Sequence, residues 1–339
     1  MMNKLGKSNG THKAIFIALC VFTLCMSLVL SIFIGSRNIQ VDTVIEILKG
    51  NITNSLEQAI VNDRIVRTMF SMIAGAGLSM SGVLMQAATK NPVADPTILG
   101  VNVGCALFVV LGISILKINT SIAYIIFSLI GGILTFIVVY FVSKIGVKKA
   151  TATKLALTGV AVSSALSSLV SAVVLINPEL TDKYRFWQVG SVAKASMDHI
   201  TLTLPVVVIC IIVSIGLIKL LNILSMGDDI ATTLGVKVSS IRFLVCSIAV
   251  ILCSVVTALA GPIGFIGLMA PHIVRLIFGS DYKYIATLSP IVGAIVLTIS
   301  DVIGRYLGSP GELEVGIVTA FIGAPILLLL AMRSKETSM

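Results

Sequence analysis

The side chains that could carry out catalysis are few in this 339-residue sequence, and their spacing fits no enzyme class. A nucleotide-binding P-loop requires G-x-x-x-x-G-K-[ST], but the stretch Gly6 to Ser8 has Met1 where the first glycine is needed. An intramembrane aspartyl protease would hold its two aspartates within apolar helices, whereas Asp228 and Asp229 lie in a polar stretch. The sequence therefore predicts no catalytic residue and no ATPase activity of its own.

Metal and nucleic-acid binding are also unsupported. The six cysteines all lie in apolar stretches without metal-ligand spacing, so we interpret them as small apolar side chains. Among the three histidines, only His272 lies outside a loop. The net charge of +9 is not gathered into a basic stripe with interleaved aromatic residues. We predict no metal site, no cofactor bound by this chain and no nucleic-acid partner.

A face of hydroxyl side chains is the first pattern that indicates a function. Serines recur at i, i+1, i+4, i+5 and i+8 in one apolar stretch, which places them on one face of a helix. They are Ser163, Ser164, Ser167, Ser168 and Ser171. The spacing supports close helix packing and an uncharged pathway wall equally, and both can hold at different depths. The stretch 313–332 has a similar small face, and we assign Thr319 to the same wall.

Small residues also recur in the stretch 65–86, at Ser71, Gly75 and Ser79. Four-residue spacing of small side chains lets membrane helices approach closely. Here we favour packing over a pathway.

The elements that position these residues are long apolar stretches. Hydrophobic residues make up 57% of the chain and charged residues 12%, about half of the charged fraction of a soluble domain. A helix needs ~20 apolar residues to cross ~30 Å of hydrocarbon. We count ten candidates, of which the eighth is short and the ninth indistinct: 14–34, 65–86, 98–116, 120–143, 155–176, 200–221, 241–260, 262–278, 284–303 and 313–332.

We therefore predict an all-α, polytopic membrane protein with about ten transmembrane helices, nine being the alternative. We expect residues 1–339 to form a single transmembrane domain with short connections. The first stretch is longer than a signal-peptide core and lacks a small-x-small cleavage site, so we expect it to remain as a helix. Asp95 and Pro96 are expected to cap and begin the third helix.

The distribution of lysine and arginine indicates the orientation. With the N-terminus in the cytoplasm, most basic residues fall in cytoplasmic loops, as the positive-inside rule requires. Ten crossings then place the C-terminus in the cytoplasm as well. Most helix centres lack ionisable residues, which argues against a proton-coupled carrier, although that class stays as an alternative.

The polar stretch from Met226 to Arg242 lies between two apolar stretches on the predicted cytoplasmic side. Ile230, Leu234 and Val236 can form one apolar strip on a short helix. The stretch therefore predicts a small amphipathic element on the cytoplasmic face of the protein.

Four blocks resemble the FecCD-type permeases of ABC importers, which take up iron-siderophore complexes and vitamin B12. In chain order they read RIVRTMFSMIAGAGLSMSGVLMQAATKNPVADPTILGVNVGCAL, GDDIATTLGV, GPIGFIGLMAPHIVRLIFGSDYK and SDVIGRYLGSPGELEVGIVTAFIGAPILLLLAMR. The resemblance extends from Arg64 to Arg333.

The resemblance implies a permease subunit in a bacterial cytoplasmic membrane, paired with a second permease subunit as a homo- or heterodimer around one pathway. It implies two cytosolic ATPase subunits that hydrolyse ATP, and an extracytoplasmic substrate-binding protein. It also implies that the segment of about 222–240 forms short coupling helices that contact the ATPase. We assign the contact to Asp228, Asp229, Leu234, Gly235 and Val236.

The resemblance leaves the cargo open among iron-siderophore complexes, haem and cobalamin, and we favour iron-siderophore complexes as the most common use. On the predicted outer side, Arg64, Arg67 and Arg305 run against the general charge bias. Local pairing with acids such as Asp301 is one explanation. The other, which we favour for Arg305 and for at least one of Arg64 and Arg67, is docking to acidic residues of the binding protein, because a guanidinium binds a carboxylate bidentately.

Overall fold

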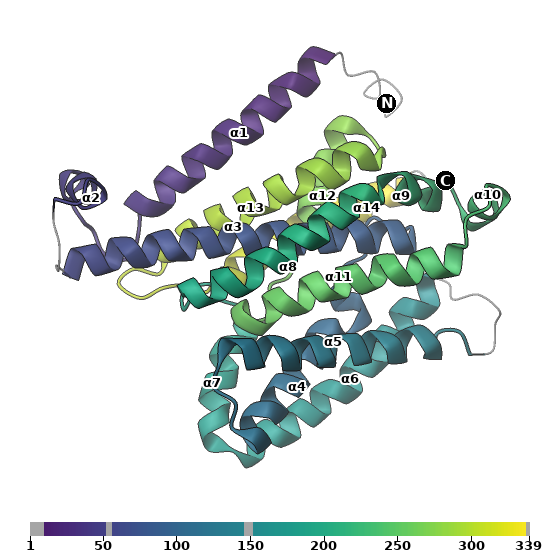
Figure 1. The fold of residues 1–339 in the computed structure, drawn as a ribbon, viewed down its shortest axis with the longest axis horizontal. Helices are drawn as coiled ribbons and strands as arrows, with labels where there is room; N and C mark the ends of the chain where they lie inside the picture. Colours follow the sequence, from purple (N-terminus) through teal and green to yellow (C-terminus); the bar gives the residue numbers. More distant parts are fainter. Residues whose placement is uncertain (1–9, 52–55, 146–151, 337–339) are drawn as a thin grey trace.

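The structure is a computed structural model that describes residues 10–51, 56–145 and 152–336. Over these residues it consists of α-helices and one short 3-10 helix, without a strand (Figure 1). Within the described residues, seven helices are long and apolar enough to cross a membrane. They are α1 (Gly10–Phe33), α3 (Leu56–Thr89), α5 (Ser121–Val142), α6 (Ala152–Ile176), α8 (Met197–Gly216), α11 (Val238–Ala260) and α13 (Tyr282–Leu307).

Three further helices have shorter apolar segments: α4 (Val101–Leu116), α12 (Ile266–Phe278) and α14 (Val315–Glu336). Together these helices coincide with the ten predicted stretches, so the all-α, polytopic fold is confirmed. The short eighth stretch is α12 with 13 residues. The indistinct ninth is α13, a continuous helix of 26 residues.

Short elements connect the long helices: α2 (Val41–Leu48), η2 (Pro96–Leu99), α7 (Pro178–Val189), α9 (Ile218–Ser225) and α10 (Asp228–Thr233). The Asp95 carboxylate accepts a hydrogen bond from the backbone N–H of Thr97 at 2.9 Å, as the predicted cap requires. The prediction that Pro96 begins the third long helix is wrong, however. Pro96 begins η2, and α4 starts only after Gly100, whose φ of +73° turns the chain.

Small residues hold the centre of the fold together. A Cβ placed on Gly75 of α3 would lie 2.3 Å from the carbonyl oxygen of Gly293 in α13, so the two backbones touch. The Ser79 hydroxyl donates a hydrogen bond to the carbonyl oxygen of Ser289 at 2.7 Å. The expected packing role of the small residues in α3 is confirmed, and these contacts place α3 and α13 at the core.

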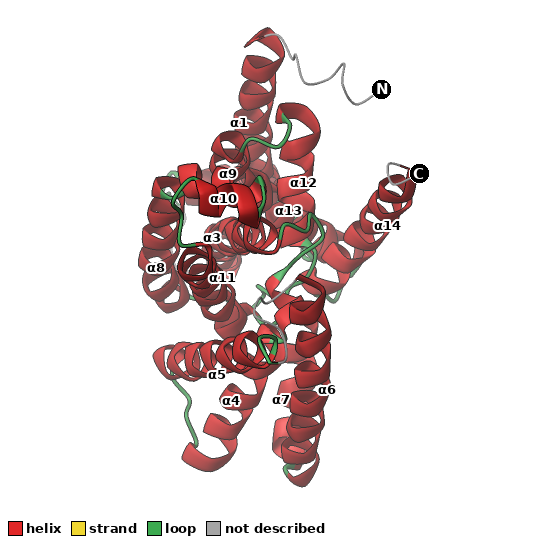
Figure 2. Cartoon of the chain, turned by 90° about the vertical axis from the view of Figure 1, so that its right-hand side faces the viewer, coloured by secondary structure: helices red, strands yellow, loops and turns green. Residues whose placement is uncertain are grey.

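The long helices run between two ends of the molecule. One end carries α10, the start of α1 and the end of α14, and α2 lies at the opposite end (Figure 1). Viewed from the α10 end, α6 and α14 border the same side of the chain (Figure 2). The predicted coupling segment therefore lies at the α10 end. The predicted pathway wall lies on the side that α6 and α14 border, and the three arginines lie at the opposite end.

Candidate functional site

The predicted coupling segment, about 222–240, begins in the second half of α9, contains α10 and ends in the first turn of α11. Leu234 is 59% exposed and Ile230 is 47% exposed, so α10 presents an apolar surface outward. Gly235 follows with a φ of +79°, a left-handed conformation that glycine adopts without steric cost. This arrangement has the exposed apolar side chains that a protein–protein contact requires.

The five residues assigned to the ATPase contact do not all face the same way. Asp229, Leu234 and Gly235 are exposed, and Val236 is half-buried. Asp228 points inward instead, where its Oδ1 atom accepts a hydrogen bond from Nη2 of Arg242 at 2.8 Å and pairs with the Lys90 ammonium group. The assignment of Asp228 to the ATPase contact stays a prediction: its side chain is 26% exposed, and its carboxylate is also bound within the chain.

Opposing contributions act on the pKa of the Asp228 carboxyl group. Partial burial raises the pKa, but the hydrogen bonds and positive charges of Lys90 and Arg242 outweigh burial and hold the pKa below its ordinary value. Asp228 is consequently ionised at neutral pH. Sequence analysis missed both basic partners, and the only signal for them was a lysine next to the polar loop and an arginine near the start of α11.

The hydroxyl face of α6 is largely uncovered in the single chain. Ser164, Ser167, Ser168 and Ser171 are exposed, and Ser163 is half-buried against Gly100. On the opposite face, Leu166 and Val173 are partly buried and pack against a cluster formed with α4. The serines thus lie on a face that is free for a second subunit or for a pathway.

Thr319 does not belong to this exposed wall. Its exposed fraction is 0%, and its hydroxyl donates a hydrogen bond to the Gly316 carbonyl oxygen at 3.1 Å. A Cβ on Gly316 would lie 1.9 Å from the carbonyl oxygen of Val189, so this face of α14 packs against the end of α7. The prediction that Thr319 lines the pathway is corrected, because the close approach at Gly316 buries it.

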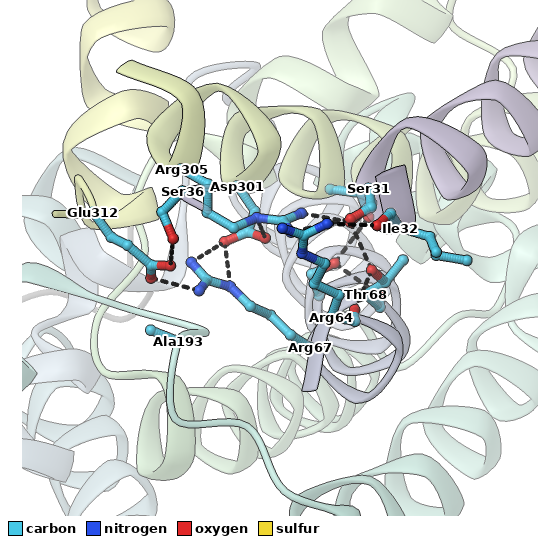
Figure 3. Close-up of polar contacts among 12 residues, drawn as sticks. Ser31, Ile32, Ser36, Arg64, Arg67, Thr68, Ala193, Asp301, Arg305 and Glu312 are labelled. Atoms are coloured by element: carbon cyan, nitrogen blue, oxygen red, sulfur yellow. Dashed lines mark hydrogen bonds and ion pairs between the residues drawn. The ribbon is translucent and has the colours of Figure 1, made fainter. Parts of the chain in front are cut away.

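The three arginines predicted to dock an external partner gather where α1 ends and α3 begins (Figure 3). Arg64, Arg67 and Arg305 are only 4%, 3% and 2% exposed. The expectation that they lie on the surface is therefore wrong. Acidic side chains and carbonyl oxygens of the same chain surround their guanidinium groups. Docking through these arginines stays a prediction, with the condition that the partner must replace a contact within the chain.

Asp301 lies at the centre of this arginine cluster. Its Oδ1 atom accepts hydrogen bonds from Nε of Arg67 at 2.9 Å and from Nη2 of Arg67 at 2.6 Å. Its Oδ2 atom lies 3.1 Å from Nε of Arg305, an ion pair in which the N–H is not aimed at the oxygen. The local pairing of Asp301 with Arg305 is thus confirmed, and one buried carboxylate neutralises two arginines in part.

The end of α1 provides oxygen atoms for the remaining guanidinium nitrogens. Arg64 donates to the carbonyl oxygen of Ile32 at 3.0 Å and, beyond the end of α1, to that of Arg37 at 2.5 Å. Arg305 donates to the carbonyl oxygen of Ser31 at 3.0 Å and to its hydroxyl at 2.7 Å. The last carbonyls of a helix have no partner within the helix, and positive charge is favourable there.

Glu312 connects this cluster to the surface. Its side chain is 33% exposed, and its Oε2 atom accepts a hydrogen bond from Nη1 of Arg67 at 2.6 Å. Ser36 donates to the other oxygen at 3.1 Å. Partial burial raises the pKa of Glu312, but Arg67 outweighs it and holds this pKa below its ordinary value. Sequence analysis missed Glu312, for which the only signal was an acid in the loop after Arg305.

The helical architecture, the exposed apolar surface of α10 and the arginine cluster together fit a membrane permease. Comparison with known proteins agrees. Residues 22–333 match the FecCD transport family, so the chain belongs to that family, whose members are permease subunits of ABC importers. The protein is accordingly an ABC importer permease with multiple membrane-spanning helices.

Named relatives cover nearly the whole chain. It is 34% identical over 329 residues to the ferric enterobactin transport system permease protein FepD of Escherichia coli (strain K12), covering 97% of this chain and 98% of that protein. It is 36% identical over 333 residues to the Fe(3+)-citrate import system permease protein YfmD of Bacillus subtilis (strain 168), covering 97% of each.

A solved structure of a metal-chelate type ABC transporter in an inward-facing conformation superimposes with a TM-score of 0.80 at 28% identity. The superposition covers 94% of this chain and 99% of the chain in that structure.

Proposed function

We propose that this chain forms the membrane pathway of an importer for an iron-siderophore complex. The observation that carries the proposal is the full-length similarity to permeases named for ferric enterobactin and Fe(3+)-citrate import. The uncovered serine face of α6 supports it, because uncharged hydroxyls suit a bulky chelate that does not shed its ligands. The importer lies in a bacterial cytoplasmic membrane.

The working assembly contains a second permease subunit, two cytosolic ATPase subunits and an extracytoplasmic binding protein. The exposed strip of Ile230 and Leu234 supports α10 as the ATPase contact. The start of α1 and the end of α14 lie at the same end of the fold as α10, which supports a cytoplasmic location for both termini (Figure 1).

Reconstituted uptake tests this function. The permease, its ATPase and its binding protein are placed in vesicles, and entry of iron-55 bound to a catecholate, hydroxamate or citrate chelator is measured with ATP. We expect ATP-dependent uptake of one chelate class that continues when an ionophore collapses the proton gradient. Uptake that stops with the gradient, or that occurs with haem or cobalamin alone, contradicts the proposal.

The outer end docks the binding protein through the arginine cluster. The half-exposed Glu312 binds the outer guanidinium nitrogen of Arg67. A carboxylate of the binding protein therefore reaches Arg67 by taking the place of Glu312. Arg67 then keeps its buried bonds to Asp301 while its outer nitrogen exchanges one carboxylate for another. Such contacts at the edge of an interface mainly affect the association rate and its salt dependence.

The substitution Glu312→Gln tests this exchange, with Glu314→Gln in the same loop as the matched control. We expect Glu312→Gln to tighten capture of the binding protein, because a neutral amide competes less well for the guanidinium group. Glu314→Gln leaves capture unchanged. Docking through Arg67 is contradicted if Glu312→Gln and Glu314→Gln capture the binding protein equally well and if the capture does not depend on salt concentration.

A further inference from the structure

The inward-facing carboxylate of Asp228 connects the coupling segment to the end of α3. The same Oδ1 atom pairs with the Lys90 ammonium group and accepts a hydrogen bond from Nη2 of Arg242 at 2.8 Å. Arg242 is itself buried and donates from Nε to the carbonyl oxygen of Ala88 at 2.8 Å. The start of α10 is therefore bound to the last turn of α3 through two basic side chains.

Lys90 marks the point where α3 stops. Its φ of +54° is a left-handed conformation, which ends the helix and redirects the chain. The residues that follow, 91–100, run back into the protein, where the Asp95 cap and η2 give them a defined shape. A displacement of Lys90 is thus passed to a short, structured segment rather than to a free loop.

This segment is packed directly against α6. A Cβ on Gly159 of α6 would lie 2.0 Å from the carbonyl oxygen of Ile98, and a Cβ on Gly100 would lie 2.5 Å from the Ser163 hydroxyl. Backbone lies against backbone here, without a flexible side chain between them to absorb a shift. Ser163 is also the first serine of the hydroxyl face.

We propose that Asp228 is a positioning residue that transmits movement of the coupling segment, through Lys90 and residues 91–100, to the hydroxyl face of α6. This inference rests on the proposed role of α10 as the ATPase contact. Ile230 and Leu234 bind the ATPase from outside, and Asp228 passes the resulting displacement inward. The decisive evidence is whether Asp228, Lys90 and the hydroxyl face of α6 act as one unit during transport.

A purely structural role for Asp228 predicts a different outcome. If the ion pairs only stabilise α10, their loss lowers the yield of the complex with the ATPase, and the complex that does form transports normally. Transmission predicts the reverse: a complete complex that hydrolyses ATP without moving cargo. The ratio of cargo imported to ATP hydrolysed distinguishes these two roles, because it does not depend on yield.

The experiment uses the reconstituted importer with its binding protein, and compares Asp228→Asn, Lys90→Gln and the combination of both. The matched control is Lys219→Gln, which removes an exposed lysine of α9 from the same end of the molecule. We expect each single variant to co-purify with the ATPase and hydrolyse ATP, while cargo imported per ATP falls by at least about 5-fold. The double variant is no worse than Asp228→Asn alone, because Asp228→Asn already removes the connection to Lys90.

The conservative variant Asp228→Glu keeps a carboxylate between Lys90 and Arg242 and is expected to retain much of the ratio. The inference is overturned if Asp228→Asn imports as much cargo per ATP as the wild type, if the two single effects add, or if Asp228→Glu loses as much of the ratio as Asp228→Asn although the complex assembles. Failure of the proposed function is distinct, because the wild-type importer would then show no ATP-dependent uptake at all.

Discussion

Removing the charge of Asp301 is expected to destabilise the protein far more than removing that of Glu312. Asp301 is 1% exposed and contacts both Arg67 and Arg305, so Asp301→Asn leaves two buried guanidinium groups with one half-buried acid. Breaking a buried ion pair by removing one partner costs about 3–5 kcal/mol. That corresponds to a 10²- to 10⁴-fold change in the unfolding equilibrium, at about 1.4 kcal/mol per tenfold.

Glu312→Gln provides the comparison within the same cluster. The Glu312 side chain is 33% exposed, and pairs that reach solvent contribute about 0–1 kcal/mol. Both carboxylates bind Arg67, so the two variants differ mainly in burial.

The assay is denaturant-induced unfolding of the purified permease in detergent, followed by the fluorescence of Trp187, the one tryptophan of the chain. Adding Arg305→Met to Asp301→Asn is expected to recover part of the lost free energy of unfolding, because Arg67 and Glu312 then remain as a pair of opposite charges. A loss below about 1 kcal/mol for Asp301→Asn, or simple addition of the two effects, would refute the role assigned to this carboxylate.

Three further outcomes follow from the same structure. Leu234→Asp places a charge on the exposed apolar surface of α10 and should prevent co-purification with the ATPase while the permease still inserts; a complex that survives contradicts the contact. In a variant without native cysteines, Ser168→Cys should react with a water-soluble thiol reagent and Val173→Cys should not, and equal labelling removes the wall. Because the folded pKa of Glu312 is lowered, its pair with Arg67 stabilises fully above the ordinary pKa of about 4.3 and is lost as pH falls through the folded value. The difference in melting temperature between wild type and Glu312→Gln should therefore stay constant from about pH 6 to 8 and shrink in acid; a difference that grows in acid would show the opposite sign.

The sequence alone determined the helical architecture and the packing between its central helices. The length of an apolar stretch is a local property, and a membrane admits few structures other than helices for such stretches. The small residues of α3 were likewise recognised as packing residues, because their spacing along one helix already describes a face. Gly75 indeed touches Gly293. The apolar surface of α10 was predictable for the same reason.

Only the tertiary structure decided which polar groups are buried and which partners they have. Arg67 binds Asp301 and Glu312, which lie 234 and 245 residues away in the chain, and no local pattern specifies contacts at that separation. Asp228 and Asp229 are adjacent in the sequence, yet one is bound inside and the other is exposed. A charged side chain is stable inside the fold only where opposite charges and hydrogen-bond partners converge on it, and that convergence is produced by the packing of distant helices.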